Sequence, residues 1–505
     1  MGTLIKDNLK RDFFSSLPLE ISLKILTNLC FEDISRCLQV SKDWNQLING
    51  TSFLWKRLML CEGFVTEENF KKYCQEVPIY HQNLTNVEDR FRLDFLRNRS
   101  YLRNWVNPDF KPYRKTLRGH TTSVVTCLQF DDDYVITGAD DKMIHVYDSR
   151  TEKFKTQLTG HEGGVWALKY DKDGTLVSGS TDRSVRVWNI KEGKCTHIFK
   201  GHTSTVRCLD IVEHKGKKFI VTGSRDNTLH VWRLPNCKSP DYNPRKCEIY
   251  NTTANNPFFV GVLRGHMASV RTVSGHGNIV ISGSYDHNLM IWDIAEMKCL
   301  YVLTGHSDRI YSTIYDYKRH RCISASMDST IRVWDLKNIH KNGHCSMISS
   351  STNPCTKITG AMLTLQGHTA LVGLLGLSDK FLVSAAADGS LRGWDSNDYS
   401  RKFAYHHTNL SAITTFCMND NLLVSGSEGQ FNVYSLRTGK LVHSNLLRDA
   451  DQIWSVKFNN RKLVAAVEKG GSSFVEILDF GNCSDDDLGA DNDSVNSTTL
   501  LGFSS

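Results

Sequence analysis

The sequence has no long apolar run. No part of its 505 residues offers about 20 consecutive apolar residues, the length that a transmembrane helix needs. The N-terminus, MGTLIKDNLKRDFF, also lacks the apolar stretch of a signal peptide. Gly2 would suit N-myristoylation, but Lys6 stands where that motif requires Ser or Thr. We therefore expect a soluble chain with no membrane partner.

Cysteine and histidine motifs at the spacing of a zinc site are also missing. The 15 cysteines are an odd number, and several lie within predicted strands, such as Cys127, Cys208, Cys322 and Cys417. This pattern predicts reduced, mostly buried thiols in a cytosolic or nuclear protein. Neither a glycine-rich phosphate loop nor a nucleophile–base pair is evident, so we expect no metal, no cofactor and no catalytic residue.

The sequence also lacks a strong net charge. The formal charge of +7 is modest for this length, so it does not by itself indicate nucleic-acid binding, and the location of the charges matters more than their sum. With 40% hydrophobic and 10% aromatic residues, the chain fits an ordered protein of more than one domain. Residues 481–505 are acidic and rich in Ser and Asn, which predicts a disordered tail.

What the sequence does contain is a repeat. Residues 117–292 hold four copies of one pattern: a Gly-His pair, a small-residue pair before an Asp, and a strand that ends in Trp or Tyr. His120, His161 and His202 lie 41 residues apart. A period of roughly 40–45 residues with these signals is typical of the WD40 repeat, in which each copy forms one four-stranded propeller blade.

The repeat continues to residue 480. A fifth copy ends at Asp335, a sixth begins at His368, and two weaker copies follow that lose the Gly-His and Trp-Asp signals. We therefore predict an all-β propeller of eight blades over 113–480, and leave open whether the eighth blade is complete. Inserts near 235–257 and 338–360, rich in Asn, Pro and Ser, are predicted to be surface loops of unassigned role.

The residues before the propeller predict helices. After a lead at 1–13, residues 14–60 form three short apolar stripes; Pro18 suits the first turn of the first helix, and Ser41 can cap the third. Such short helices cannot bury all their apolar surface among themselves, so it faces either a partner or the propeller. Residues 61–112 form a helical linker, in which a helix over 87–106 would span about 30 Å as a stiff spacer or cover the first blade.

Cations and aromatic residues gather on one rim of the predicted disc. The histidine of each Gly-His pair and the turn aspartate lie on that rim, where His161, Ser178, Asp182 and Trp188 fit an internal hydrogen-bond chain, so we assign the histidines a structural role. Blades one to five place further residues around them. The cations are Lys142, Arg183, Arg207, Arg225, Arg271 and Arg309, and the aromatic residues are Trp166, Tyr285 and Tyr311.

Six neighbouring cations cost Coulomb energy unless carboxylates or a bound anion offset it. One interpretation pairs each arginine with a turn aspartate such as Asp182, Asp226 or Asp286. The excess of arginine over lysine favours a second interpretation, in which the arginines bind a phosphate through bidentate hydrogen bonds. With aromatic walls beside the cations, the rim suits a phosphorylated Ser/Thr-Pro peptide in extended form.

The stretch LPLEISLKILTNLCFEDISRCLQVSKDWNQLINGTSFLWKRL resembles an F-box along its whole length. Followed by WD40 repeats, residues 14–480 resemble the F-box/WD40-repeat substrate-recognition subunits of SCF, the cullin-RING ubiquitin ligase. The resemblance implies that this F-box docks the SCF adaptor subunit, and through it the cullin-RING core. The implied adaptor contacts are Leu17, Pro18, Ile21, Ile25 and Leu26, with Leu38 and Trp55 as partly structural companions.

For the rim, the resemblance implies a clamp for a phosphothreonine made by Arg207, Arg225 and Arg271. Arg183 and Lys142 then widen the basic surface, Trp166 forms the wall for the following proline, and Tyr285 and Tyr311 shape the flanking pockets. The chain would be a non-catalytic receptor that directs phosphorylated cell-cycle regulators to ubiquitination and proteasomal degradation. The resemblance places it in the nucleus, with the cytoplasm as an alternative, and leaves a homodimer open.

Two other functions are compatible with parts of this sequence. A propeller that binds nucleic acid or inositol phosphates would also use a basic rim, but it leaves the F-box unused and predicts a steep salt dependence without peptide preference. A hydrolytic enzyme would need reactive groups beyond those that the WD40 pattern explains. The sequence identifies neither the substrates nor the number of phosphates that an optimal site requires.

Overall fold

The computed structural model describes residue 12 and residues 17–75, 89–339, 344–348, 355–444 and 446–481, with side chains omitted at 344–348. The chain divides into two compact units, Met1–Pro112 with Phe480–Ser505 and Tyr113–Asp479, which are described separately. The predicted lead at 1–13 and tail at 481–505 lie outside the described residues except for Asp12 and Gly481. Among the described residues, no helix combines the length and apolarity of a bilayer span.

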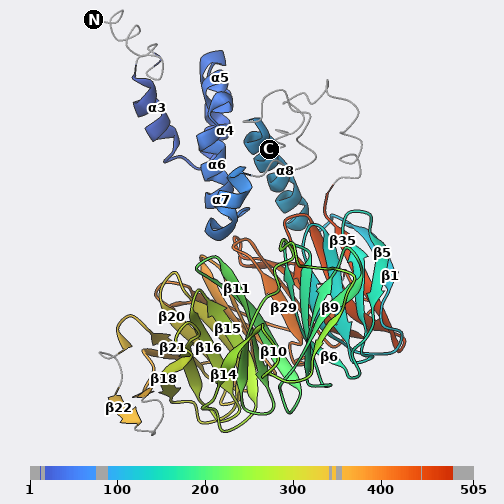
Figure 1. Cartoon of the computed structure of the whole chain (residues 1–505). Coiled ribbons are helices and arrows are strands. Elements are labelled where there is room, and N and C mark those ends of the chain that lie inside the picture. The colour runs from blue at the N-terminus through green and yellow to red at the C-terminus, as the bar shows by residue number, and fades with distance from the viewer. Residues whose placement is uncertain are drawn as a thin grey trace, which may run out of the picture. The chain divides into compact units, whose positions relative to one another are not determined.

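The first unit is helical, as predicted (Figure 1). The N-cap of its first helix is Pro18, and Ser41 caps the third, where the Ser41 hydroxyl accepts a hydrogen bond from the Trp44 N–H at 3.2 Å. The helix predicted over 87–106 is observed as α8. The helices are α3 (Leu19–Leu26), α4 (Phe31–Cys37), α5 (Lys42–Gly50), α6 (Ser52–Cys61), α7 (Glu67–Gln75) and α8 (Arg90–Trp105).

Aromatic side chains form the core of this unit. Phe95 of α8 lies between Phe31 and Trp55, with ring centroids 4.9 and 5.6 Å away. At the end of α8, Trp105 stacks on Phe480 at 3.6 Å, and the Asn104 side chain donates a hydrogen bond to the Phe480 carbonyl at 2.7 Å. Helix α8 therefore packs against α4 and α6 and also against the returning end of the chain.

The second unit is the predicted eight-bladed propeller, with four antiparallel strands in each blade (Figure 1). The second strand of a blade is buried on both faces because neighbouring blades pack against it, and every residue of Thr175–Ser180 is buried. The first four blades are β2 (Val125–Phe130), β3 (Tyr134–Ala139), β4 (Ile144–Asp148) and β5 (Lys153–Leu158); β6 (Val165–Asp171), β7 (Thr175–Ser180), β8 (Ser184–Asn189) and β9 (Lys194–Lys200); β10 (Val206–His214), β11 (Lys217–Ser224), β12 (Leu229–Arg233) and β14 (Phe259–Leu263); β15 (Val270–His276), β16 (Ile279–Ser284), β17 (Leu289–Asp293) and β18 (Lys298–Thr304).

The remaining blades complete the ring, and the eighth takes its outer strand from the start of the unit. They are β19 (Ile310–Asp316), β20 (Arg321–Ser326), β21 (Ile331–Asp335) and β24 (Leu363–Leu365); β25 (Val372–Leu377), β26 (Phe381–Ala386), β27 (Ser390–Asp395) and β28 (Arg401–His406); β29 (Thr415–Met418), β30 (Leu422–Ser427), β31 (Gln430–Ser435) and β32 (Lys440–His443); β33 (Gln452–Phe458), β34 (Lys462–Lys469), β35 (Ser472–Asp479) and β1 (Tyr113–Arg118).

The two inserts are more than surface loops. The first contains β13 (Glu248–Tyr250), which runs parallel to β9 of the second blade. The second contains β22 (His344–Ile348) and β23 (Cys355–Thr359), and β23 runs parallel to β18 of the fourth blade. An outer strand presents unpaired backbone N–H and C=O groups, and each insert covers such an edge on the preceding blade.

A buried carboxylate fastens the eighth blade. Strand β1 pairs with β35 over six residues. Within this pair Glu476, which is 0% exposed, accepts hydrogen bonds from the Thr116 hydroxyl at 2.9 Å and from Arg114 Nε at 2.8 Å, and it also contacts Lys469. Arg114 and Lys469 each reach Asp449 at 2.8 Å. Although burial alone raises the pKa of Asp449, these two cations hold it at about 2.

Glu476→Gln should weaken ring closure. The variant leaves Lys469 and Arg114 without their central anion, and loss of one partner from a buried charge network costs about 2–4 kcal/mol. We expect a lower urea midpoint for the unfolding of the propeller, followed by tryptophan fluorescence. Glu213→Gln, an exposed glutamate of the third blade, is the matched control. Equal midpoints for both variants would contradict the assigned role of Glu476.

Candidate functional site

Each of the first five blades uses its Gly-His histidine to hold its own turn. In the second blade, His161 Nδ1 lies 2.7 Å from the Asp182 carboxylate and Nε2 lies 2.7 Å from the Ser178 hydroxyl, which also accepts a hydrogen bond from the Trp188 indole at 2.8 Å. Because a carboxylate only accepts, Nδ1 donates and Nε2 accepts. The corresponding His–Asp contacts are His120–Asp141, His202–Asp226, His266–Asp286 and His306–Asp328.

Burial sets the protonation of this chain of groups. It lowers the pKa of His161, so the imidazole is neutral near pH 7. Burial alone would raise the pKa of Asp182, but the hydrogen bonds from His161 and Ser184 hold it well below its usual range. A neutral histidine with both nitrogens bonded is a structural group, in agreement with the sequence interpretation.

The seventh blade keeps this histidine, which the sequence analysis did not recognise. His407 lies 2.7 Å from the Ser425 hydroxyl and 2.6 Å from that of Ser427. It follows His406 instead of glycine. In the second, fifth and sixth blades that glycine packs against an arginine, as Gly160 does against Arg186. The seventh blade has the shorter Asn432 at this position of β31, which leaves room for a side chain. The 18-residue separation of His407 from Ser425 was the available signal.

The turn aspartates impose a left-handed residue on the rim. Lys142 and Arg183, which directly follow these aspartates, have φ of 72° and 70°. A non-glycine residue takes this conformation at some cost, and here it is held because Asp182 Oδ1 accepts the N–H of Ser184 at 2.8 Å. The turn thereby presents the Lys142 and Arg183 side chains, both exposed, on the rim of their blades.

A backbone hydrogen bond also joins the turn to the Gly-His loop. The residue before the turn aspartate donates its N–H to the carbonyl of the residue three after the histidine: Arg225 to Thr205 at 3.0 Å and Tyr285 to Ser269 at 3.0 Å. The predicted site residues occupy these two connected segments or the first residues of the inner strand. The repeat therefore positions them at the same end of successive blades.

Five of the predicted residues form one cluster. The Arg207 guanidinium lies 5.2 Å and that of Arg309 4.9 Å from the Tyr285 ring centroid, and Arg271 lies 5.7 Å from the Tyr311 ring. The two tyrosine rings are 5.5 Å apart. Burial, and next the neighbouring Tyr285 hydroxyl, raises the pKa of Tyr311. The third, fourth and fifth blades thus supply a surface of three arginines on two tyrosines, which we call the arginine–tyrosine cluster.

The other four predicted residues lie on the same rim but outside this cluster. Arg225, Arg183 and Lys142 are exposed, and Trp166 is 40% exposed. Within the described part of the chain, no side-chain hydrogen bond, ion pair or ring contact joins any of them to the cluster. Two exposed methionines that the sequence analysis did not assign as site residues, Met267 and Met327, lie in the rim segments of the fourth and fifth blades: one follows His266 and the other precedes the turn aspartate of its blade.

The rim cations are not offset by the turn aspartates. These carboxylates are occupied by histidines and by backbone N–H groups: Asp226, for example, accepts from His202 at 2.8 Å and from the Thr203 N–H at 3.0 Å. Among the described residues, none of the six rim cations forms an ion pair. The interpretation that pairs each arginine with a turn aspartate therefore does not describe this structure.

Two lysines farther along the strands from the rim are paired. Lys218 lies 2.7 Å from Asp171, and Lys169 lies 2.9 Å from Asp210. Each of those ion pairs joins the second blade to the third. Cations that stabilise the contact between blades therefore do have carboxylate partners. At the rim the charge is left uncompensated, and Arg271 Nε is buried without a hydrogen-bond partner. A dianion such as a phosphate would satisfy both demands.

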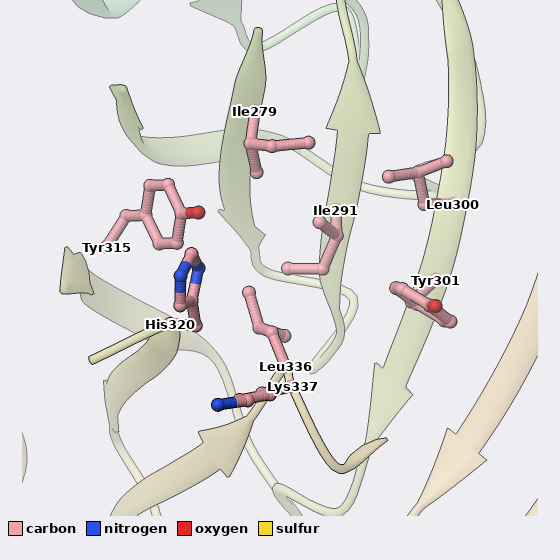
Figure 2. A pocket seen from close by; sticks show the side chains of 8 residues that line it. All are labelled: Ile279, Ile291, Leu300, Tyr301, Tyr315, His320, Leu336 and Lys337. Atoms are coloured by element: carbon pink, nitrogen blue, oxygen red, sulfur yellow. The ribbon is translucent and has the colours of Figure 1, made fainter. Parts of the chain in front are cut away.

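Two other groups of residues in the propeller have features of a binding site. An apolar pocket of about 300 Å³ opens between the fourth and fifth blades at the end of the strands away from the rim (Figure 2). It is lined by Ile279, Ile291, Leu300, Tyr301, Tyr315, His320, Leu336 and Lys337. It holds none of the predicted site residues, and its apolar walls offer little to a charged ligand.

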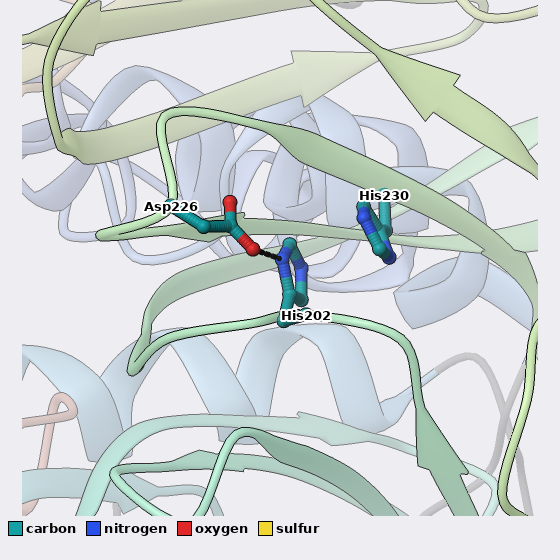
Figure 3. A group of neighbouring side chains, drawn as sticks. All are labelled: His202, Asp226 and His230. Atoms are coloured by element: carbon teal, nitrogen blue, oxygen red, sulfur yellow. Dashed lines mark hydrogen bonds and ion pairs between the residues drawn. The ribbon is translucent and has the colours of Figure 1, made fainter.

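His202, Asp226 and His230 lie close enough together to suggest a metal site (Figure 3). Both nitrogens of His202 are already hydrogen-bonded, to Asp226 and Thr222 at 2.8 Å. Its ring stacks on His230 at 3.8 Å with an interplanar angle of 19°, so the nitrogen lone pairs do not converge on one point. Burial lowers the pKa of His230 to about 3. We assign the group a packing role.

The F-box helices carry an exposed apolar face. Of the predicted adaptor contacts, Ile21 and Ile25 on α3 are exposed, as is Pro18 at its start, whereas Leu17 and Leu38 are half-buried. Leu26 and Trp55 are buried in the helical unit and lie in its core, because they sit on the inner side of their helices. Additional exposed apolar residues, unassigned in the sequence analysis, are Leu19, Val40 and Phe53.

Family models agree with these two parts. The model described as F-box-like matches residues 14–61, and that described as WD domain, G-beta repeat, matches residues 111–148, 152–189, 193–233, 258–293 and 297–335. Cell division control protein 4 of Candida albicans is 41% identical over 95% of this chain and 70% of its own length. F-box/WD repeat-containing protein sel-10 of Caenorhabditis elegans is 31% identical over 67% of this chain and 72% of its own length. The chain belongs to the family of F-box/WD-repeat proteins.

A particular relative is more similar still. Cell division control protein 4 of Saccharomyces cerevisiae is 65% identical over 96% of this chain, and the chain spans 62% of the length of that relative. Among solved structures, the computationally designed Ika8 protein matches 72% of this chain and 98% of its own, with a TM-score of 0.57 and 26% identity. The yeast relative covers both units.

The buried histidines predict an acid-sensitive propeller. Burial lowers the pKa of His407 and of His368 to about 4, against 6.5 for the unfolded chain. Below pH 6.5 the unfolded state therefore binds more protons, and stability falls as the pH drops toward 4, by about 1 kcal/mol per pH unit for each such histidine. We expect urea midpoints that decrease from pH 7 to pH 5. His407→Gln should show a shallower decrease, and an unchanged slope would contradict a neutral, buried His407.

Proposed function

We propose that this chain is the substrate-recognition subunit of an SCF (cullin-RING) E3 ubiquitin ligase. Its F-box would bind the adaptor subunit, and its rim would bind phosphorylated Ser/Thr-Pro segments of cell-cycle regulators, which are then ubiquitinated and degraded by the proteasome. The observation that carries the proposal is the uncompensated arginine–tyrosine cluster, in a chain that also has an exposed F-box face.

The chemistry of the cluster suits a phosphate. A guanidinium that lies over an aromatic ring uses its face for that contact and keeps its N–H edge free for bidentate hydrogen bonds. Arg207 and Arg271 are held in this way by Tyr285 and Tyr311. A phosphothreonine brings a charge of about −1.5 to −2 and three acceptor oxygens to them. The arginines are preorganised, so little side-chain entropy is lost on binding.

The surroundings favour a peptide over other polyanions. Trp166 offers an exposed aromatic surface that suits a proline, and Met267 and Met327 add exposed apolar contacts on the same rim. A nucleic acid or an inositol phosphate would use only the charges. In this proposal the chain contributes no reacting group. It raises the effective concentration of substrate lysines near a ubiquitin-conjugating enzyme brought by the partner subunits.

The clamp can be tested with a fluorescent Leu-Leu-phosphoThr-Pro peptide. We expect it to bind in fluorescence anisotropy at moderate salt, whereas the unphosphorylated peptide does not. Arg225→Ala should weaken binding by about 30-fold, equivalent to ~2 kcal/mol for a lost charge-assisted contact. Arg233→Ala is the matched control, because this arginine is exposed on β12 of the same blade but at the opposite end of the strand.

Each outcome separates the alternatives. Equal binding of both peptides, or equal effects of Arg225→Ala and Arg233→Ala, would overturn the clamp assignment. Binding of a mixed-sequence oligonucleotide as tightly as the phosphopeptide, with a steep salt dependence, would favour a general polyanion site. Unchanged urea midpoints for the two variants exclude a loss of binding through unfolding.

The F-box face makes an independent prediction. Ile25→Ser removes an exposed apolar side chain from α3, and burial of isoleucine at an interface contributes about 2 kcal/mol. We expect affinity for the purified SCF adaptor, measured by calorimetry, to fall at least tenfold. Lys24→Ser changes the neighbouring exposed residue of the same helix and should bind normally. If both variants bind like the wild type, the adaptor does not use this face.

A further inference from the structure

The strands added by the two inserts start at cysteines. Cys247 directly precedes β13, whose Glu248 lies opposite His197 of β9. Cys355 is the first residue of β23, whose next residue lies opposite Tyr301 of β18. In both cases an insert from one blade crosses to the outer strand of the preceding blade. The second and third blades are joined in this way, and so are the fourth and fifth.

The outer strand that receives each insert has a cysteine at the matching place. In β9, Trp188 pairs with Cys195 and Val187 with His197, which leaves one extra residue as a bulge. In β18, Trp292 pairs with Cys299 and Ile291 with Tyr301, so the bulge lies at the equivalent position. The thiols of Cys195 and Cys299 make the same contact, 3.5 Å from the carbonyl oxygen two residues ahead.

The register places the two cysteines of each pair opposite each other on adjacent strands. Cys247 lies one residue before the Glu248–His197 pair, and Cys195 lies two residues before His197, so both lie at the bulge. Neighbouring strands are about 4.8 Å apart, and a disulfide joins Cα atoms about 4.4–6.8 Å apart. Cys355 and Cys299 repeat this geometry in the fourth blade.

The side chains interact as thiols. Burial and then the adjacent Cys247 raise the pKa of Cys195 to about 12, and burial and then Cys355 raise the pKa of Cys299. All four are free cysteines in this structure, and Cys247 is exposed to solvent. By contrast, Cys208 is enclosed in an inner strand, where its thiol lies near backbone carbonyls.

We propose that Cys195 with Cys247, and Cys299 with Cys355, are two dithiol sites that hydrogen peroxide converts to intrachain disulfides, each fastening an insert to the preceding blade. At the first site, the Cys247 sulfur attacks peroxide, the O–O bond breaks, and a sulfenic acid and one water form. The Cys195 sulfur then attacks that sulfur, the S–S bond forms, and the hydroxyl leaves with a proton as a second water. Two thiols lose two electrons, which one peroxide accepts.

Peptide mapping of the full chain tests the bonds directly. Trypsin cuts after Lys194, Lys200, Lys246 and Arg264, so an oxidised first site yields the peptides 195–200 and 247–264 as one species that separates on reduction. The second site is mapped in a Cys345→Ser background, because residues 342–357 contain both Cys345 and Cys355. After peroxide treatment we expect both linked species. Iodoacetamide added after the peroxide marks any thiol that is still reduced. Cysteines at these four positions that are alkylated, sulfinated or linked to other cysteines would overturn the proposal.

A stability readout distinguishes fastening from mere oxidation. Peroxide should raise the thermal midpoint of the propeller by about 3 °C, and a reductant should reverse the rise. Cys247→Ser should abolish the linked first pair and reduce the rise, whereas Cys237→Ser, on the same insert, should leave both unchanged. No rise in the wild type, or an equal loss in the two variants, would contradict a fastening role. These measurements use no phosphopeptide, so their outcome is independent of the proposed ligase function.

Discussion

The hydrogen bond between a buried histidine and a turn aspartate organises one rim of this propeller. This hydrogen bond orients the turn. The turn then holds Arg225 and Tyr285 against the Gly-His loop of the same blade through backbone hydrogen bonds of 3.0 Å. The same bond uses up the carboxylates, because Asp182 and Asp226 accept from histidines and backbone N–H groups. A repeat that stabilises each blade thus also leaves the arginines between blades without anionic partners. The cationic rim is a direct consequence of how the blades hold themselves together.

The cost of that arrangement is limited by aromatic contacts. Tyr285 lies under two guanidinium groups, and Tyr311 lies under a third, so part of the charge is screened by ring faces. Carboxylates would screen the charge better, as Asp171 and Asp210 do for Lys218 and Lys169 away from the rim. Cations that are already paired with carboxylates gain less from a phosphate, because the phosphate must compete with those carboxylates. The unpaired rim cations therefore gain more energy when an anion binds.

Much of this could be predicted from the sequence, because the signals of a blade are local. The Gly-His, the turn aspartate and the strand tryptophan recur in six copies, and they place the nine rim residues on one edge. The last two blades are predicted from their alternating strands alone. The closing pair of β1 with β35 joins segments about 360 residues apart, which no local pattern encodes. The strands within the inserts depend on the open edges of β9 and β18, which are tertiary features. The burial of Leu26 likewise depends on packing among helices, and the choice of tyrosine under each arginine depends on how neighbouring blades align.

The two proposed binding surfaces differ in physical kind, and the difference suits their proposed roles. The face of α3 is apolar, so its association with a partner depends on buried area and responds little to ionic strength. The rim is cationic, so its association depends on the charge of the ligand and weakens with salt. A threonine offers the rim no charge, whereas its phosphorylated form offers nearly two. One surface can therefore stay occupied while the other responds to phosphorylation, and in the proposed role this combination selects which protein is brought to the ligase.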